Sequence, residues 1–175
     1  MTTTLEIRIL SQDDAGELFR LRRSALLDSP RAFLASPEDD AASSEDAVRG
    51  LLAPKPNSVV FGAFTPGPGL IGMLGLHRAQ QRKAAHKVNL WGAFVLPEYR
   101  GQGAAAQLLA AAVRYARTLD GVTSMHLGVS ESAVAARRLY EKFGFEAWGV
   151  EPDAIRFEGR SESEQHMRLS LKEGV

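Results

Sequence analysis

A glycine-containing turn between an apolar run and a helical pattern constrains the fold of this 175-residue chain more than any other segment. The apolar run ends at Pro97, Gly101 and Gly103 follow, and a helical pattern extends over residues 107–119. The two glycines allow backbone angles and a close approach of a ligand that a Cβ would block. Backbone N–H groups then converge at the start of a helix, where phosphate groups bind. The segment therefore predicts an anion site for a phosphate or pyrophosphate.

The spacing within this turn narrows the type of anion site. Arg100, Gly103 and Ala105 match the pattern Arg/Gln-x-x-Gly-x-Gly/Ala, so the turn resembles the acetyl-CoA pyrophosphate site of the GNAT N-acetyltransferase family. A dinucleotide-type G-x-G-x-x-G does not fit, because residue 106 is alanine and no acidic residue stands at the end of a following strand. A nucleoside triphosphate is also disfavoured, since the chain has no Gly-Lys-Ser/Thr element.

A second motif lies beyond the next predicted strand. Four apolar or aromatic residues are spaced at i, i+3, i+4 and i+7, on one face of a helix: Ala136, Leu139, Tyr140 and Phe143. Gly144 then ends the helix. This segment resembles the second GNAT motif, in which the tyrosine lies beside the thioester sulfur. A tyrosine on an apolar helix face is more often a core aromatic, but two motifs in the family's order favour the functional role.

The composition is that of a globular enzyme. Hydrophobic residues make up 45% and charged residues 24% of the chain, and its length suits one domain with a hydrophobic core. By the resemblance, this would be a single N-acetyltransferase domain over residues 1–175. Because 21 basic and 21 acidic residues give a formal net charge of zero, we expect no nucleic-acid partner. The absence of cysteine excludes disulfides, thiolate metal sites and an acyl-cysteine intermediate. Acyl transfer must then be direct or use another nucleophile, and we expect no metal.

The sequence also bears on location. The N-terminus, from Met1 to Leu10, lacks the basic start and long apolar run of a signal peptide. The alanine-rich run over residues 104–113 is too short to span a bilayer. We therefore expect a cytoplasmic protein with no membrane partner.

The order of the predicted elements indicates a mixed α+β fold rather than a doubly wound one. We expect strands at residues 5–10, 58–64, 70–77, 87–96, 124–129, 145–150 and 165–171, with helices after 11–14, from 43–46, over 107–119 and around Tyr140. This layout resembles the GNAT fold over nearly the whole chain. The resemblance implies a mixed, mostly antiparallel sheet of six to seven strands, about four flanking helices, and splayed fourth and fifth strands, here residues 87–96 and 124–129.

The resemblance also implies an activity and its site. The protein would be an acyltransferase that moves the acetyl group of acetyl-CoA to a primary amine, by direct attack through a tetrahedral intermediate. Pantetheine would meet the backbone of three residues, Phe94, Val95 and Leu96. The pyrophosphate would meet the turn and the first helical residues: Arg100, Gly101, Gln102, Gly103, Ala104 and Ala105. Tyr140 would protonate the leaving thiolate, because a phenol with a pKa of about 10 stays protonated at neutral pH.

The general base is open at this point. The long strand has Asn89 and Trp91 where many family members have a carboxylate. Candidates are Glu38, His126 or a water chain, and the weaker ones are His77, His86 and Glu131. A lone strand histidine is usually structural, and an acidic residue in a loop is usually solvated.

Two departures from the family pattern bear on the subfamily. Many members have asparagine where this chain has Ala133, so one cofactor contact is lost. The ribosomal-protein alanine acetyltransferases have glutamate where this chain has Gly128, so that activity is not supported. By resemblance, residues 24–53 and 151–165 set acceptor specificity. Acidic residues of the first segment, among them Glu38, Asp39 and Asp40, would attract a cationic amine, although a solvated charged loop is the commoner explanation of such residues.

Two further questions stay open. A GNAT-shaped module that binds acyl-CoA as a sensor or partner-binding subunit, without turnover, is the alternative to an enzyme. Retention of Tyr140 together with the complete turn favours catalysis, since a binding module has no need of the phenol. A homodimer is also compatible with the sequence, because Trp91 suits a dimer contact, an acceptor pocket or a half-buried strand position equally well.

Overall fold

The computed structural model describes residues 5–171, so the first four residues of the N-terminal segment discussed above lie outside the described part. Seven strands form one sheet: β1 (Glu6–Ile9), β2 (Ser58–Thr65), β3 (Gly69–Arg78), β4 (Lys87–Val95), β5 (Ser124–Ser130), β6 (Glu146–Phe157) and β7 (Arg160–Ser170). Their order is β1-β2-β3-β4-β5-β7-β6. Neighbouring strands are antiparallel except β4 and β5, which are parallel. The predicted mixed, mostly antiparallel sheet is confirmed.

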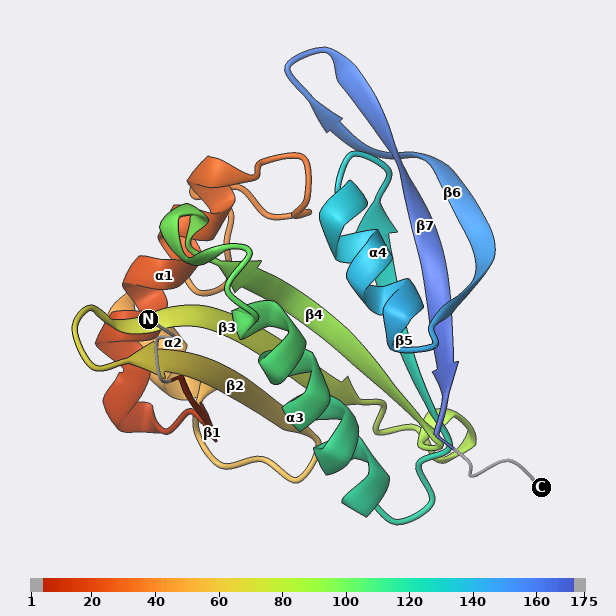
Figure 1. Cartoon of the computed structure of the whole chain (residues 1–175), viewed down its shortest axis with the longest axis horizontal. Coiled ribbons are helices and arrows are strands. Elements are labelled where there is room, and N and C mark those ends of the chain that lie inside the picture. Colours follow the sequence, from red (N-terminus) through yellow and green to blue (C-terminus); the bar gives the residue numbers. More distant parts are fainter. Residues whose placement is uncertain (1–4, 172–175) are drawn as a thin grey trace.

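Four α-helices flank the sheet within the described residues: α1 (Ala15–Asp28), α2 (Glu45–Leu51), α3 (Ala104–Thr118) and α4 (Val134–Lys142). In Figure 1, α3 and α4 lie in front of the sheet and α1 and α2 behind it. Two hydrophobic clusters match these two layers, one beneath α3 and α4 and one beneath α1 and α2. None of the helices in residues 5–171 is long and apolar enough to cross a membrane.

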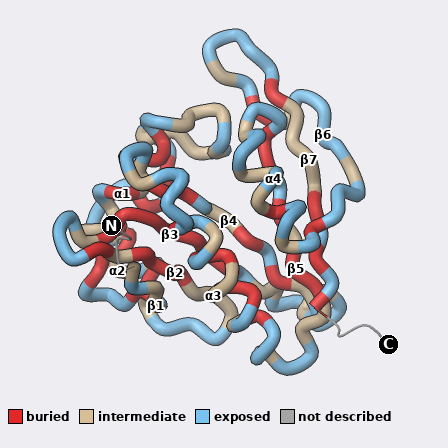
Figure 2. The backbone as a smooth tube through the Cα atoms, viewed as in Figure 1, coloured by how far each residue is buried: buried red, intermediate tan, exposed pale blue. Residues whose placement is uncertain are grey.

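The amphipathic sequence of α3 explains how the front layer packs. Leu108, Leu109 and Ala112 are buried against the sheet, whereas Arg114 and Arg117 on the opposite face are exposed. Figure 2 shows that burial is highest in the central strands and falls toward β6, which is mostly exposed. The core therefore lies around β2, β3, β4 and β5.

Pairing between β4 and β5 ends early. The two strands pair at Lys87 with Ser124, Val88 with Met125, and Asn89 with His126. Beyond these pairs β5 stays bonded to β7 up to Ser130 with Glu164, but the described strands show no further β4–β5 pairs. The two strands diverge from this point, as Figure 1 shows. The predicted splay is therefore present, and it leaves one edge of each strand unpaired inside the sheet.

A β-bulge in β4 lies within the splayed part. Met73 on β3 pairs with Phe94, but Gly75 pairs with Trp91, so β4 has one residue more than β3 over this interval. Gly92 within the bulge has a φ of +63°, a conformation that side chains with a Cβ rarely adopt. The bulge redirects the backbone of β4 just before the glycine turn.

The C-terminal hairpin differs from the prediction. Strands were expected near residues 145–150 and 165–171, but β6 and β7 are 12 and 11 residues long. The parts of the two strands that were not expected, residues 151–157 and 160–164, are rich in charged residues and lack an alternating apolar pattern. Hydrophobic periodicity therefore did not predict them as strands. The register of β6 shifts twice against β7, between Ala147 and Gly149 and between Glu151 and Ile155. The segment expected to influence specificity is thus an irregular hairpin.

An ion pair fixes the loop between α1 and α2. Both oxygens of Asp40 accept hydrogen bonds from Arg22, at 2.6 Å each, and the side chains are only 5% and 14% exposed. Burial alone would raise the pKa of Asp40, but the hydrogen bonds and charge of Arg22 outweigh it and hold that pKa below its ordinary value. The Arg22 guanidinium also lies 5.8 Å from the ring of Trp91 on β4. The loop is therefore fastened to α1 beside the bulge.

Replacing one member of this pair should destabilise the fold. Asp40→Asn leaves the guanidinium of Arg22 without its counter-charge, so we expect the free energy of unfolding at pH 7 to fall by about 3 kcal/mol. The folded-state pKa of Asp40 is lowered, so its contribution is present above the unfolded pKa and is lost as pH falls through the folded one. Urea unfolding of wild type and variant from pH 7 to pH 3 measures both effects.

Two further variants control this prediction. Glu38→Gln removes an exposed charge from the same loop and should change stability by less than about 0.5 kcal/mol. Arg22→Met combined with Asp40→Leu removes both charges and should recover most of the lost stability. Equal stability of Asp40→Asn and wild type at pH 7 would show that the pair does not hold the loop.

Candidate active site

The glycine turn and the start of α3 form a cradle of free N–H groups. Gly101 and Gly103 have φ values of +75° and +86°, as their predicted roles require. Gly103 is the N-cap of α3, and no side chain caps this end of the helix. A Cβ added to Gly101 would meet nothing within 4 Å, so the turn is open on that side. An uncapped 15-residue helix with an open glycine turn has the donors and the space that a pyrophosphate needs.

The predicted helix over residues 107–119 begins earlier in the structure, at Ala104. Ala104 is buried and Ala105 and Gln102 are exposed. The first N–H bonded within the helix is that of Gln107, which donates to the carbonyl of Gly103 at 3.0 Å. The N–H groups of the preceding turn therefore point out of the helix end without intrahelical acceptors.

The backbone of β4 offers fewer free groups than the sequence implied. The N–H of Leu96 donates to the carbonyl of Ile71 on β3 at 2.9 Å. Because backbone groups alternate in direction along a strand, the N–H and C=O of Val95 then face the splay. The side chains of Phe94 and Val95 are buried, at 7% and 8% exposure, in the clusters behind and in front of the sheet. Of the three residues expected at pantetheine, Val95 has the backbone that faces this gap.

The side chain of Arg100 folds back over β4. Its Nε donates to the carbonyl of Val95 at 3.0 Å, and its Nη2 donates to the Asp28 carboxylate at 2.6 Å. This bond from Arg100 is the main cause of the lowered pKa of Asp28. The guanidinium also lies 5.4 Å from the ring of Phe94. In this state the arginine is paired with the end of α1 and covers the Val95 carbonyl.

Tyr140 lies in the front hydrophobic cluster, which also contains Val95 of β4 and Val129 of β5. It is 6% exposed, and its ring lies 5.7 Å from that of Phe145. Burial raises the pKa of Tyr140 to about 12. The hydrogen bonds of the described residues include none from its hydroxyl. The phenol is therefore a protonated donor without a protein acceptor, in the cluster that also contains residues of both diverging strands.

The structure separates the candidates for the general base. His126 is half-buried, hydrogen-bonded to Ser124 at 3.0 Å, and located in the last pair between β4 and β5. Burial, together with Lys87 and Arg168, lowers its pKa. Glu38 is exposed in the α1–α2 loop.

The three weaker candidates lie in structural positions. His77 lies near the end of β3, opposite Asn89, and His86 lies just before β4. Both are therefore near the paired end of the strands. Glu131 exchanges hydrogen bonds with the backbone of Ser163, so it ties the end of β5 to β7.

One buried charged group was missed by the sequence analysis. Glu162 on β7 is 4% exposed, and its carboxylate accepts hydrogen bonds from Arg31 at 2.8 Å and from Ser130 at 3.0 Å. Burial alone would raise its pKa, but the hydroxyl groups of Ser130 and Ser132 and the charge of Arg31 lower it. These bonds join the α1–α2 loop to the ends of β5 and β7. No local pattern links residues 31 and 162, so only the fold reveals the contact.

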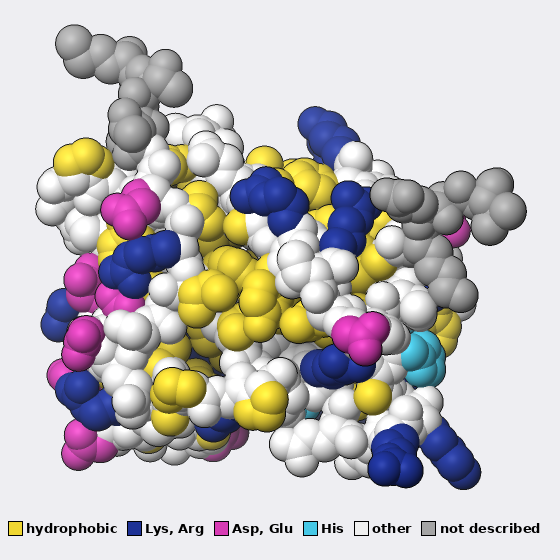
Figure 3. All heavy atoms as spheres, turned by 90° about the horizontal axis from the view of Figure 1, so that it is seen from below, with side chains coloured by type: hydrophobic (Ala, Val, Ile, Leu, Met, Phe, Trp, Pro, Cys, Tyr) yellow, Lys and Arg dark blue, Asp and Glu magenta, His cyan; other side chains and the backbone are white. Residues whose placement is uncertain are grey.

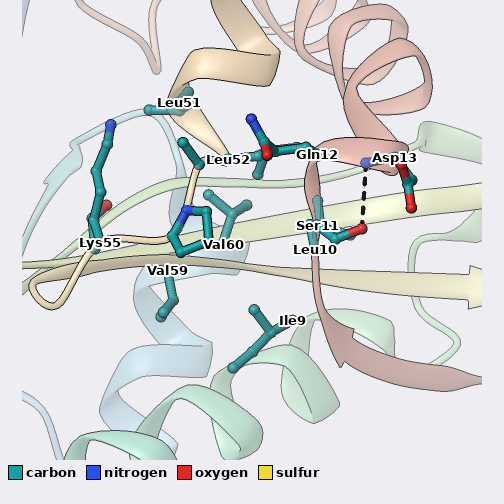
Figure 4. A pocket seen from close by; sticks show the side chains of 13 residues that line it. Ile9, Leu10, Ser11, Gln12, Asp13, Leu51, Leu52, Lys55, Val59 and Val60 are labelled. Atoms are coloured by element: carbon teal, nitrogen blue, oxygen red, sulfur yellow. Dashed lines mark hydrogen bonds between the residues drawn. The ribbon is translucent and has the colours of Figure 1, made fainter.

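Other surface features lie away from this site. Figure 4 shows a pocket on the β1–β2 side of the sheet, lined by Ile9, Leu10, Ser11, Gln12, Asp13, Leu51, Leu52, Lys55, Val59 and Val60 among others. Two strands separate it from the splay, so it belongs to a different part of the molecule. The face seen in Figure 3 has hydrophobic side chains near its centre, with basic and acidic side chains around them.

Comparisons with known proteins agree with this geometry. An acetyltransferase of the GNAT family from Streptococcus pneumoniae has a TM-score of 0.83 and 21% identity, covering 97% of this chain and 100% of that one. A proposed acetyltransferase from Salmonella typhimurium, yncA, solved with its cofactor acetyl-CoA, has a TM-score of 0.81 and 21% identity, covering 99% of this chain and 97% of that one. The ribosomal-protein alanine N-acetyltransferase from Escherichia coli has a TM-score of 0.74 and 19% identity, covering 98% and 97%.

These identities are low, so the three structures show a shared fold. No curated protein sequence matches the chain significantly. The family evidence comes from the sequence model of the acetyltransferase (GNAT) family, which matches residues 20–145 and so includes both the glycine turn and the tyrosine helix. The chain therefore belongs to the GNAT family of acetyltransferases.

Proposed function

We propose that this protein transfers the acetyl group of acetyl-CoA to a primary amine of a small molecule or peptide, with residues 1–175 acting as one domain. The observation that carries the proposal is the location of the uncapped start of α3 directly after the unpaired stretch of β4. The helix end suits a pyrophosphate, and the strand edge suits the amide groups of a pantetheine arm. Acetyl-CoA carries both a pyrophosphate and a pantetheine arm, so one extended molecule would occupy the helix end and the strand edge together.

The chemistry follows from groups that face the divergence of β4 and β5. The amine nitrogen bonds to the thioester carbon, and the carbonyl oxygen gains negative charge. The N–H of Val95 is positioned to donate to that oxygen. The C–S bond then breaks, and Tyr140 donates its proton to the sulfur. The high pKa of Tyr140, about 12, keeps this proton in place at neutral pH.

Arg100 has a second role in this proposal. Its guanidinium must leave the Val95 carbonyl if pantetheine is to bond there. The arginine then exchanges its bond to Asp28 for the phosphates beyond the turn, with backbone N–H groups as the main anion donors. Acetyl-CoA binding should accordingly be accompanied by a shift of Arg100.

In this proposal the acceptor amine binds between the α1–α2 loop and the β6–β7 hairpin. Arg31 and Glu162 join these segments. The acidic residues of this loop, Glu38, Asp39 and Asp40, present less negative charge to a ligand than the sequence indicates, because Asp40 is paired with Arg22. The E. coli relative acts on an alanine of a ribosomal protein, so a peptide with an N-terminal alanine belongs among the amines to be tested beside spermidine, lysine and kanamycin.

Isothermal titration with acetyl-CoA, CoA and desulfo-CoA, followed by thiol release with these four amines, tests the proposal. Micromolar binding with amine-dependent thiol release supports the transferase. Binding without release for any amine favours a protein that binds acyl-CoA without turnover, and absence of binding would overturn the reading of the cradle.

Tyr140→Phe should separate binding from turnover. The ring remains in the core, so the affinity for acetyl-CoA should stay within about twofold, whereas loss of the proton donor should lower kcat by about 100-fold. Titration calorimetry and thiol release measure the two quantities. Tyr115→Phe, a matched change at a half-buried tyrosine of α3 that packs against the same cluster, is the control, and an unchanged kcat in Tyr140→Phe would remove the proposed role.

Gly103→Val should weaken acetyl-CoA binding by at least about tenfold, because the branched side chain disfavours a positive φ and narrows the N-terminus of α3. Gly159→Val is the matched control, since Gly159 also has a positive φ, +74°, but lies in the β6–β7 turn. Both variants should lose some stability, which thermal melting reports. Equal loss of affinity in the two variants would contradict a specific role of the cradle.

A further inference from the structure

The splayed strands have no carboxylate of their own on the face that turns away from α4. Met125, Leu127 and Val129 of β5 belong to the front cluster beneath α4. The alternate residues therefore face the other way, and among them Gly128 lies beyond the last pair with β4. This face of β5 borders the splay on the side where α1 and α2 lie. A proton acceptor for an amine has to come from a neighbouring strand.

Glu164 on β7 supplies a carboxylate at this place. Glu164 pairs with Ser130, and its side chain leans over the neighbouring strand so that its carboxylate occupies the space of a side chain on Gly128. A Cβ on Gly128 would collide with the carboxylate of Glu164. The absence of a side chain at Gly128 is thus what lets the carboxylate of Glu164 lie over a residue of β5 that has no partner on β4.

Two ionisable side chains lie beside the Glu164 carboxylate: ligand atoms of Glu151, Glu164 and His166 are all within 4.8 Å of one another. On β7, His166 bonds to Glu151 of β6 at 3.2 Å and stacks on Trp148 at 5.4 Å between ring centroids. On β5, His126 bonds to Ser124. Within residues 5–171 no ion pair or hydrogen bond joins a side chain to the Glu164 carboxylate, in contrast to the fully bonded Glu162. Glu164 is half-buried, so its carboxylate is accessible to a bound amine.

We propose that Glu164 is the general base for the acceptor amine, acting from β7 across Gly128. This inference rests on the proposed acetyl transfer. The amine nitrogen bonds to the thioester carbon and becomes positively charged, and the Glu164 carboxylate takes one proton from it. The C=O bond reforms as the C–S bond breaks, and the sulfur receives the proton of Tyr140. The products are the acetylated amine and CoA thiol, and the proton on Glu164 passes to solvent as the tyrosine is reprotonated.

This assignment explains why neither β4 nor β5 shows a base in its sequence. On β4, Asn89 lies in the last pair with β5 and Trp91 lies beside the bulge, and the face of β5 at the divergence has Gly128. Glu38 is exposed in the loop, and His126 lies at the paired end of the strands. Two carboxylates lie over the unpaired part of β5 in the described residues: that of Glu162 is held by Ser130 and Arg31, whereas that of Glu164, over Gly128, has no hydrogen-bond donor.

Glu164→Gln tests the proposal with the full-length protein, acetyl-CoA, and whichever of spermidine, lysine, kanamycin or the alanine peptide the wild type acetylates fastest. We expect kcat to fall by about 100-fold and KM for acetyl-CoA to stay within about twofold. Glu146→Gln, an exposed change on β6, is the matched control and should leave both unchanged. A kcat of Glu164→Gln within about twofold of wild type would overturn the assignment.

Relocation of the carboxylate distinguishes catalysis from a structural role. Gly128 is not among the described glycines with a positive φ, so a side chain fits its backbone once Glu164 is shortened. Glu164→Gly should be as slow as Glu164→Gln. The combination of Gly128→Glu with Glu164→Gly returns a carboxylate to the same space from β5, and we expect it to regain at least about tenfold in kcat over Glu164→Gly.

The outcomes separate this inference from the proposed function. Wild-type protein that releases no thiol with any of the four amines overturns the transferase and the role of Glu164 with it. Turnover by wild type with an unaffected Glu164→Gln overturns only the role of Glu164. A third outcome also contradicts a base at this place: Glu164→Gln is slow, and the Gly128→Glu, Glu164→Gly double variant regains no activity although thermal melting shows that it is folded.

Discussion

The early end of pairing between β4 and β5 is the constraint on which the rest of the structure depends. Parallel strands normally gain hydrogen bonds along their whole length, and unpaired backbone groups cost free energy when they are buried. Here the bulge at Gly92 turns β4 away, and Arg100 reaches back to bond the Val95 carbonyl. The protein therefore keeps an open edge inside its sheet by covering part of it with its own side chain. The cradle of α3 begins where that edge ends.

Much of this arrangement was predictable because its causes are local. The positive φ of Gly101 and Gly103, the helix that starts after them and the apolar face with Tyr140 follow from residue spacing. The mixed, mostly antiparallel sheet and the splay came from the family resemblance that those two motifs carry. The family match over residues 20–145 and the seven-stranded sheet confirm that inference.

The rest of the site was not predictable, because its contacts join residues far apart in the chain. Asp40 looked like one member of an exposed acidic group until its pairing with Arg22 was known. Glu162 and Glu164 lie in a segment without a periodic pattern, and their surroundings come from Arg31, Ser130 and Gly128 on other elements. A long-range ion pair leaves no trace in local sequence. Such residues are found only once the strands are placed side by side.

The irregular hairpin of β6 and β7 has a consequence for solubility. β6 is the last strand of the sheet, so one row of its backbone groups has no partner strand among the described residues and is open to association with another chain. Its two register shifts and the positive φ of Asp153 interrupt that row, and charged side chains such as Arg156 lie along it. At the other border β1 is only four residues long. Both borders of the sheet thus resist edge-to-edge aggregation, while the unpaired edge between β4 and β5 lies in the interior of the sheet, with strands on either side.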